Sequence, residues 1–443
     1  MNTEIPSRLT NRLHLWTGLQ WLLCLLAGNL VLAPAAFSQS AVTTLAGSVL
    51  TSGSTDGNTA VALFSDPTGL AMDGNGNIYV ADNQNHTIRK LSPDGVVSTL
   101  AGRAGQAGSA DGTGTNAFFN NPSGVALDNN GTLYITDTGN HTIRRIAPSG
   151  AVDTLAGKAG ESGTTNATGN LARFNTPLGI AVDQSGVLYV ADSANQLIRR
   201  ITSAGAVSTL AGIPEVWGSA DGPVNTATFN CPAGVAVDNN GNVYVSDSNN
   251  HAIRKITPAG AVTTWAGSVG VDGNVDATGQ AARFGKPGEL KIDKGNNLFV
   301  VDSFNHTIRK LTTNAVVTTI AGSAGNGGAA NGLGDEARFL NPYGLAVDRN
   351  GNLRVSDTYN QTIRFLYAPI AASLTQPSAN GSFVIAWQAV PGNQYQVQSR
   401  NAIGEAAWQN LGAVVTATTT TATQTDDSTP TVPQRFYRVL LLP

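Results

Sequence analysis

The feature that most constrains this chain is a motif that returns at a constant interval of 55 residues. A proline marks the same point of each of its six copies: Pro67, Pro122, Pro177, Pro232, Pro287 and Pro342. The copies follow one another without insertion or deletion between the first proline and the last. A fixed period of this length is the signature of a repeat architecture, in which each copy is one structural unit.

One copy contains four segments that are rich in β-forming residues. In the second copy these segments are residues 124–128, 133–137, 142–146 and 152–155. Asn130-Gly131 is a hairpin signal between the first two segments, and the turn at residues 148–150 separates the last two. Each copy is therefore predicted to form a four-stranded antiparallel meander, which is the blade of a β-propeller.

The two ends of the repeat region indicate how the ring closes. The sixth copy has its first three strands, ending near Tyr367, and no counterpart of the fourth strand follows. Residues 41–47, Ala-Val-Thr-Thr-Leu-Ala-Gly, stand before the first copy in register with the fourth strand at residues 96–102. We predict an all-β fold, a six-bladed propeller over residues 41–367 that an N-terminal strand closes, since closure removes the free sheet edges of an open array.

Several short elements recur in most blades: Pro-x-Gly, an Asp that ends strand one, Tyr-Val/Ile-x-Asp in strand two, Asn-His, and Ile-Arg-Lys/Arg in strand three. These elements resemble the NHL-repeat family, and the resemblance covers residues 41–367. Ala-Arg-Phe at residues 172–174, 282–284 and 337–339 is similar to secreted bacterial members of that family. The resemblance implies a six-bladed propeller whose ligand is recognised outside the cytoplasm.

The segments outside the repeats indicate export and a second domain. Arg8 and Arg12, the apolar run at residues 16–32 and the small residues at 35–38 form the pattern of a secretory signal over residues 1–38, cleaved near Ser38 or Ser40. An uncleaved membrane anchor is the alternative. With cleavage we expect a secreted, periplasmic or cell-surface protein without a membrane span.

Residues 371–443 differ in composition from the repeats and are predicted to form a small β-sandwich that resembles a fibronectin-III domain. Its expected strands are residues 383–387, 395–398 and 436–440, between Gly-, Pro- and Thr-rich turns. The Thr-rich stretch at residues 416–431 fits either a loop or an edge.

Charge and cysteine content exclude some partners and stabilising devices. The net charge of −3 provides no broad basic field, so we expect no nucleic-acid partner. Removal of the signal would leave Cys231 as the remaining cysteine, and an intrachain disulfide is then impossible. Packing and ring closure must stabilise the protein, which we expect to be a monomer.

Two aspartates and one arginine recur at fixed positions in every blade. The aspartates end strand one (Asp73, Asp128, Asp183, Asp238, Asp293, Asp348) and strand two (Asp82, Asp137, Asp192, Asp247, Asp302, Asp357), and the arginines lie in strand three (Arg89, Arg144, Arg199, Arg254, Arg309, Arg364). Sixfold repetition favours a scaffolding role, because every blade needs the same caps and pairs. The functional alternative is a ring of carboxylates that binds Ca²⁺.

Four of the five histidines share one register, in the turn between strands two and three. They are His86, His141, His251 and His306, and Gln196 and Gln361 take this position in the other two blades. A ring of imidazoles suggests a zinc site, as in the peptide-amidating lyases, whose related propeller holds a metal in its channel. Substitution by glutamine favours instead a structural turn element, since a tetrahedral zinc site needs converging ligands.

Departures from the repeat pattern are better pointers to a site. Glu289 replaces the motif glycine, Lys291 replaces the motif alanine, and Arg354 replaces the aromatic residue of strand two. Glu289 and Lys291 share one strand face, so we expect them to pair with each other or with Arg354. Trp217 is the least expected residue of the long loops. Together with the four histidines, these residues are the predicted ligand-binding set.

No nucleophile elbow, phosphate-binding loop or zinc-protease helix is present in the sequence. We therefore predict a binding or scaffolding module for an extracytoplasmic protein, peptide or glycan, which contacts its ligand on the face of the long loops and Asn-His turns. We expect no required cofactor, with binding of Ca²⁺ or zinc as the alternative. The alternative is a metal-dependent lyase or lactonase with its site at the central channel, which rests on fold analogy alone.

Overall fold

The structure is a computed structural model that falls into two compact units, residues 39–369 and residues 1–38 with 370–443. It describes residues 24–26, 29–31, 40–367, 372–375, 383–389, 394–400, 408–419, 421–427 and 436–441. Much of the predicted signal segment, including Ser38, lies outside these ranges. Two short strands within that segment, β1 (Cys24–Leu26) and β2 (Asn29–Val31), pair with each other. In the described part of the chain, no helix has the length and hydropathy needed to cross a membrane.

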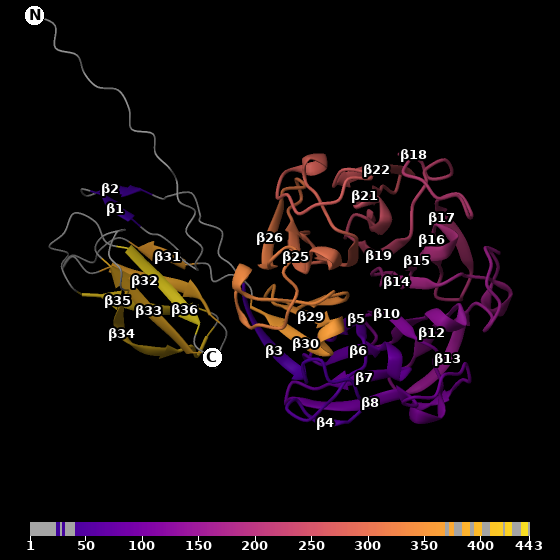
Figure 1. The fold of residues 1–443 in the computed structure, drawn as a ribbon, viewed down its shortest axis with the longest axis horizontal. Coiled ribbons are helices and arrows are strands. Elements are labelled where there is room, and N and C mark those ends of the chain that lie inside the picture. Colours follow the sequence, from indigo (N-terminus) through magenta and orange to yellow (C-terminus); the bar gives the residue numbers. More distant parts are fainter. Residues whose placement is uncertain are drawn as a thin grey trace, which may run out of the picture. The chain divides into compact units, whose positions relative to one another are not determined.

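Six antiparallel sheets arranged in a ring form the first unit (Figure 1). Blade 1 contains β5 (Pro67–Met72), β6 (Ile78–Asp82), β7 (Thr87–Leu91) and β8 (Val96–Gly102). Blade 2 contains β10 (Pro122–Leu127), β11 (Leu133–Asp137), β12 (Thr142–Ile146) and β13 (Ala151–Ala156). Blade 3 contains β14 (Pro177–Val182), β15 (Leu188–Asp192), β16 (Leu197–Ile201) and β17 (Val207–Ala211).

The remaining blades repeat this order. Blade 4 contains β19 (Pro232–Val237), β20 (Val243–Asp247), β21 (Ala252–Ile256) and β22 (Ala261–Ala266). Blade 5 contains β23 (Pro287–Ile292), β24 (Leu298–Asp302), β25 (Thr307–Leu311) and β26 (Val317–Gly322). Blade 6 contains β28 (Leu345–Val347), β29 (Leu353–Asp357), β30 (Thr362–Leu366) and β3 (Ala41–Gly47). The predicted six-bladed, all-β propeller is confirmed.

The sixth sheet joins the two ends of the repeat region. Strand β3 pairs with β30, so that Val42 lies opposite Leu366 and Thr44 opposite Arg364. A hydrophobic cluster that includes Ala346 and Ile363 of blade 6 continues into blade 1 through Ile78. The last blade therefore packs on the first as the other blades pack on their neighbours.

The prediction of four strands per blade is incomplete. Four blades gain a two-residue strand at their outer edge: β4 (Gly57–Asn58), β9 (Gly112–Thr113), β18 (Gly222–Pro223) and β27 (Gly332–Leu333). Each belongs to a long loop that enters its blade and pairs with strand four of that blade. Part of each of these long loops is thus fixed to the sheet edge.

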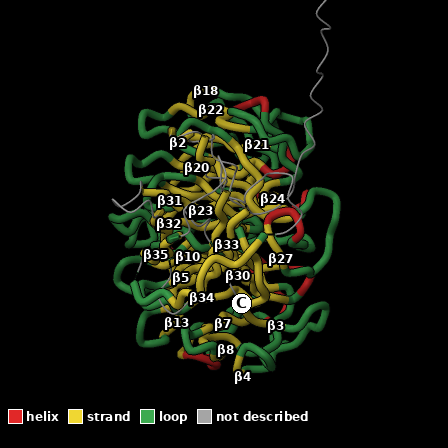
Figure 2. The backbone as a smooth tube through the Cα atoms, turned by 90° about the vertical axis from the view of Figure 1, so that its left-hand side faces the viewer, coloured by secondary structure: helices red, strands yellow, loops and turns green. Residues whose placement is uncertain are grey.

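Helix in the described chain is confined to short 3-10 turns between strands, shown in red in Figure 2. Six of them connect strands two and three: η1 (Asn83–Asn85), η3 (Thr138–Asn140), η5 (Ser193–Asn195), η6 (Ser248–Asn250), η8 (Ser303–Asn305) and η10 (Thr358–Asn360). The others lie in long loops: η2 (Gly114–Asn116), η4 (Gly169–Leu171), η7 (Gly279–Ala281) and η9 (Gly334–Glu336).

The hydrophobic core lies between consecutive blades. The cluster between blades 1 and 2, for example, joins Ala81 and Ile88 to Phe119 and Ile135. The phenylalanine at this register is fully buried in every blade, as Phe64, Phe119, Phe174, Phe229, Phe284 and Phe339. Burial of one aromatic side chain at each boundary contributes on the order of 2–3 kcal/mol to the stability of that boundary.

The second unit contains two three-stranded sheets after the repeats. One consists of β31 (Ala372–Thr375), β32 (Phe383–Gln388) and β35 (Thr421–Asp426). The other consists of β34 (Gln409–Thr416), β33 (Gln394–Arg400) and β36 (Phe436–Leu441). Trp387 of the first sheet and Tyr395, Val397 and Tyr437 of the second belong to one hydrophobic cluster. Part of the Thr-rich stretch is therefore a paired strand, β35.

Candidate functional site

The recurring Asp and Arg of strands two and three form a buried ion pair in each blade. In blade 2, Arg144 Nη1 donates to Asp137 Oδ2 at 2.8 Å and to the carbonyl oxygen of Phe118. Nη2 donates to Asp111 Oδ1 at 2.8 Å and to the carbonyl oxygen of Ala110, both in the long loop. The corresponding Arg–Asp distances in the other blades are 2.6–2.7 Å. The arginine thus holds the long loop against the sheet.

The acceptor oxygens of these buried aspartates are occupied by the protein itself. Asp137 Oδ1 accepts the N–H of Asn120 at 2.7 Å, and Oδ2 also accepts Nδ2 of Asn140 at 2.7 Å. Burial raises the pKa of Asp137 to about 6, although Arg144 acts in the opposite direction. A carboxylate with this many donors has little capacity left for a cation.

The aspartates that end strand one cap their own hairpin turns. Asp128 Oδ1 accepts the N–H groups of Asn130 and Thr132 at 2.9 Å, and Oδ2 accepts the hydroxyl of Tyr134 at 3.3 Å. The aspartates at this position in the other five blades likewise accept the N–H of the residue four positions later. Among the described residues, no three His, Cys, Asp or Glu side chains are grouped so that they could hold a metal ion.

The four histidines and two glutamines of the Asn-His register form a contact that we call the blade latch. In each, His Nδ1 or Gln Oε1 accepts the N–H of the residue that precedes the motif proline of the next blade, at 2.6–3.3 Å. The six acceptors are His86, His141, Gln196, His251, His306 and Gln361.

The latch explains the composition of this register. All six residues have φ between 56° and 62°, in the left-handed region that ends the 3-10 turn. A neutral imidazole and an amide both offer an acceptor, so glutamine can replace histidine. Burial lowers the pKa of His86, His141 and His306, which favours the neutral form that the latch needs. Each histidine serves a different blade boundary, and the structure does not bring the four together.

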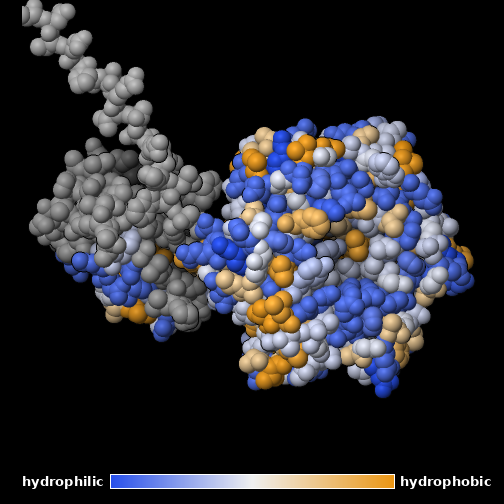
Figure 3. Space-filling model, in the orientation of Figure 1, coloured by the Kyte–Doolittle hydropathy of each residue, from blue (hydrophilic) through white to orange (hydrophobic). Residues whose placement is uncertain are grey.

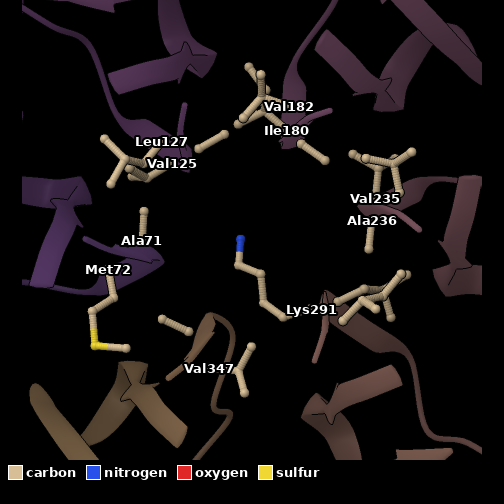
Figure 4. Close-up of a pocket in the computed structure, with 16 residues that line it drawn as sticks. Ala71, Met72, Val125, Leu127, Ile180, Val182, Val235, Ala236, Lys291 and Val347 are labelled. Atoms are coloured by element: carbon tan, nitrogen blue, oxygen red, sulfur yellow. The ribbon is translucent and has the colours of Figure 1, made fainter. Parts of the chain in front are cut away.

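A hollow of about 220 Å³ lies on the propeller axis, lined by the innermost strand of every blade (Figure 4). Its walls are alanine, valine, leucine, isoleucine and methionine side chains, and of the lining residues Lys291 alone is charged. The last residues of these strands, such as Met72, Leu127 and Val347, line it and are partly exposed. The hollow therefore opens beside the strand one–strand two hairpins, on the face opposite to the long loops.

Glu289 and Lys291 distinguish blade 5 from the others along the axis. Lys291 Nζ donates to Glu289 Oε1 at 2.6 Å, so the predicted pairing of these two residues is confirmed. Glu289 Oε2 accepts the N–H of Leu345 in blade 6 at 2.8 Å, and 3% of the Glu289 side chain is exposed. Burial raises the pKa of Glu289, although Lys291 opposes this shift. Tyr343, which the sequence did not single out, has a buried hydroxyl, and burial with the nearby Glu289 raises its pKa.

Arg354 does not join that pair, so of the two predicted pairings the one between Glu289 and Lys291 is the one that forms. Its guanidinium lies 3.7 Å from the ring centroid of Phe365, the residue opposite it on β30, and 3.7 Å from Asp348 Oδ2. In blade 4 the same two positions hold Tyr244 and Lys255, with the cation 5.5 Å from the ring. Blade 6 has exchanged cation and ring between two paired strands, which is a local compensation.

Several large apolar side chains are exposed on the long loops and on the turns between strands two and three. Trp217 of the fourth long loop is 73% exposed. Phe304 and Tyr359, 55% and 52% exposed, occupy one register in the neighbouring blades 5 and 6. Leu50, 69% exposed, lies beside Tyr359 because its N–H donates to the carbonyl oxygen of Asn360.

Of these exposed residues, the sequence analysis identified Trp217 and missed the other three. The sequence does distinguish Phe304 and Tyr359, because no other blade has an aromatic residue at this register. The residues there are Gln84, Gly139, Ala194 and Asn249. In the view of Figure 3, hydrophobic residues form small separate patches on a mainly hydrophilic propeller surface. Exposed aromatic side chains are candidates for recognition because they bury much area at a small entropic cost.

Sequence comparison places part of the chain with a known repeat. The family model described as NHL repeat matches residues 64–91, 119–146, 174–201 and 229–256. The protein SUPPRESSOR OF QUENCHING 1 of Arabidopsis thaliana is 31% identical over 275 residues, which are 58% of this chain and 26% of that protein. NHL repeat-containing protein 2 of Bos taurus is 31% identical over 294 residues, 58% of this chain and 40% of that protein. The chain thus spans less than half of either relative.

Structural comparison finds the same fold in solved structures. A structural genomics protein of unknown function from Bacteroides thetaiotaomicron superposes with a TM-score of 0.58 at 23% identity, covering 76% of this chain and 79% of that one. An auxiliary nutrient binding protein from the same organism gives a TM-score of 0.56 at 18% identity, covering 77% and 79%. At these identities the likeness concerns the fold. The chain is therefore a six-bladed β-propeller that contains NHL repeats.

Proposed function

We propose that the protein is an extracytoplasmic binding module for a protein, peptide or glycan, which contacts its ligand on the face of the long loops and Asn-His turns. The observation that carries this proposal is the exposure of Trp217, Phe304 and Tyr359 on that side of the ring. Export rests on the signal pattern at residues 1–38. The two C-terminal sheets form, in this proposal, an accessory fibronectin-III-like domain of a secreted bacterial protein.

The structure of the loops supports recognition by a surface that is already ordered before binding. Each long loop is tied to its blade by the buried arginine, for example Arg254 in blade 4, whose Nη2 donates to Asp221 at 2.7 Å. In the same blade Asn250 Nδ2 donates to the carbonyl oxygen of Gly218, next to Trp217, at 2.7 Å. A preorganised loop loses less conformational entropy on binding than a flexible one. Trp217 is thereby displayed on fixed backbone.

A propeller is compatible with this role. The auxiliary nutrient binding protein of Bacteroides thetaiotaomicron has the same fold, which shows that the fold can serve a protein with that description. Function on such a fold resides in the site and not in the blades. The exposed aromatic residues are therefore the ones to test.

The test compares the protein with a variant in which the exposed aromatics revert to residues of other blades. Trp217→Ser introduces the residue found at positions 52 and 162, and Phe304→Asn and Tyr359→Asn introduce the residue found at position 249. Both proteins are immobilised and probed with a panel of polysaccharides and with peptides and proteins from an extracytoplasmic fraction. We expect saturable binding to the unaltered protein that the triple variant weakens at least about tenfold, the loss of about 1.4 kcal/mol.

Unchanged unfolding of the triple variant is the control, because exposed substitutions usually change stability by about 0.5 kcal/mol or less. Equal binding by the two proteins would show that the ligand contacts another surface. Absence of saturable binding across all three ligand classes would refute the binding role itself.

A further inference from the structure

The axial hollow is separate from the loop face and differs from it in chemistry. Its lining residues come from the last two or three residues of the six innermost strands, with side chains from alanine to methionine. A volume of about 220 Å³ is below the range of about 300–1,000 Å³ for pockets that hold drug-sized ligands. The hollow therefore suits a small molecule that places one of its ends in the channel and its other end at the mouth of the hollow.

One exceptional residue lies two positions before Lys291 on the innermost strand of blade 5. Five blades have glycine at this level, Gly69, Gly124, Gly179, Gly234 and Gly344, and blade 5 has Glu289. The innermost strands approach closely there, since a Cβ on Gly344 would collide with the carbonyl oxygen of Thr68 in blade 1. Glu289 extends toward blade 6, where its Oε2 accepts the N–H of Leu345.

Lys291 follows Glu289 by two residues on the same face of β23 and lines the hollow. Five blades have alanine at this level, so a single long side chain enters a ring of methyl groups. Figure 4 shows the Lys291 nitrogen near the centre of the ring, away from the walls. A free lysine in such a place would extend its ammonium toward water, and the bond to Glu289 at 2.6 Å holds it inside.

The ion pair is not required for the fold. Blades 1 to 4, which have glycine and alanine at the two positions, have the same strands and the same register as blade 5, whereas the innermost strand of blade 6 begins only at Leu345. Buried ion pairs are often no more stabilising than apolar side chains of similar volume. Four blades thus form the complete innermost strand without the pair, and a role in binding accounts for the charge that it places on the axis.

The ammonium retains donors for a ligand. It carries three N–H groups, and Glu289 is the one acceptor that Nζ has within the described residues 40–367. Glu289 has both oxygens engaged, Oε1 by Lys291 and Oε2 by Leu345, so its role is to hold the lysine. The polar end of the hollow is thus a donor site, and the end near the mouth is apolar.

We propose that this hollow binds a small aliphatic monocarboxylate, with its carboxylate on Lys291 Nζ and its hydrocarbon chain against the valine, leucine, isoleucine and methionine side chains at the mouth. A charge-assisted bond to an ammonium within apolar walls favours a carboxylate over a neutral amide. Aspartates of the hairpin turns stand near the mouth, but each directs its oxygens to N–H groups of its own turn. Their negative charge limits affinity and disfavours polyanions.

The test is a calorimetric titration of the full protein at low ionic strength with hexanoate, hexanamide and hexylammonium, which share one chain and differ in the head group. We expect hexanoate to bind saturably and at least about tenfold more tightly than hexanamide, with no binding of hexylammonium. Butanoate should bind more weakly than hexanoate, because each methylene buried at the mouth contributes about 0.8 kcal/mol, close to a fourfold change.

Two paired variants show where the ligand sits. Glu289→Gly with Lys291→Ala restores the residues of the other five blades, and Glu289→Gln with Lys291→Met keeps the side-chain volume but removes both charges. Both should lose hexanoate binding at least about tenfold, and the loop-face triple variant should retain it. Hexanoate binding that survives in both paired variants, tighter binding of hexylammonium, or no binding of hexanoate to the unaltered protein would each overturn the proposal. These hexanoate titrations do not depend on the proposed binding role of the loop face, so a negative result for that role would not change them.

Discussion

Acid should weaken the blade boundaries that His86, His141 and His306 hold and spare the two that glutamine holds, because the blade latch needs an acceptor. Nδ1 of His86, His141, His251 and His306 accepts a backbone N–H from the next blade. A protonated imidazole is a donor at both nitrogens, so it would face the backbone N–H with another N–H. The amide oxygens of the two glutamine latches do not titrate.

The sign and size of the effect follow from the structure. Burial lowers the pKa of His86, His141 and His306, so the unfolded chain takes up protons at higher pH than the folded one. These histidines make their full contribution to the free energy of unfolding above about pH 6.5, the pKa of histidine in the unfolded chain. The contribution is lost as the pH falls through their lower pKa values in the folded protein. One neutral hydrogen bond contributes about 1 kcal/mol, so these three latches amount to about 3 kcal/mol.

The assay is urea unfolding at pH 7.5 and pH 5 of the protein and of a variant in which all four histidines are glutamine, as at Gln196 and Gln361. We expect equal stability within about 1 kcal/mol at pH 7.5, and at pH 5 a variant that is more stable by about 2–4 kcal/mol. Burial raises the pKa of Asp82, Asp137 and Asp247 to about 6, which favours the folded state as the pH falls, but this acts equally in both proteins. Parallel losses of stability in the two proteins would refute the latch.

Three further predictions concern the scaffold. Arg144→Ala leaves a buried aspartate without its counter-ion and should cost about 3–5 kcal/mol in urea unfolding, whereas Arg145→Ala, which breaks a half-exposed pair, should cost less than about 1 kcal/mol. Gly344→Ala places a methyl group against a carbonyl oxygen of blade 1 and should lower the free energy of unfolding by about 1–3 kcal/mol, which a thermal melt detects. Glu289→Gly with Lys291→Ala should leave stability unchanged or raise it in urea unfolding, and a loss above about 2 kcal/mol would show that the pair is structural.

The repeat period made the blades predictable from the sequence because every strand recurs six times at the same register. The edge strands were not predictable, since a two-residue pairing such as Gly57–Asn58 with β8 leaves no hydrophobic pattern. The pairing of Glu289 with Lys291 followed from the two-residue period of a strand. The partner of Arg354 was missed although Phe365 also departs from its register, and comparison across paired strands would have found it.

The location of the hollow shows where the sequence was insufficient. The long loops were predicted to carry the ligand contacts because they diverge most among the copies. The hollow opens on the opposite face, where the sequence varies little, and it depends on the diameter of the ring at the level of Lys291. That diameter is set by the packing of all six blades, and no single motif encodes it.

We infer that the repeated residues build the ring and that the exceptional residues perform its function. The most direct measurement is a binding titration on one variant that carries Trp217→Ser, Phe304→Asn, Tyr359→Asn, Glu289→Gly and Lys291→Ala together, with folding checked by its urea midpoint. We expect an unchanged urea midpoint together with loss of both hexanoate binding and loop-face ligand binding. Retained binding of either ligand by the folded variant, or collapse of its stability, would contradict this inference.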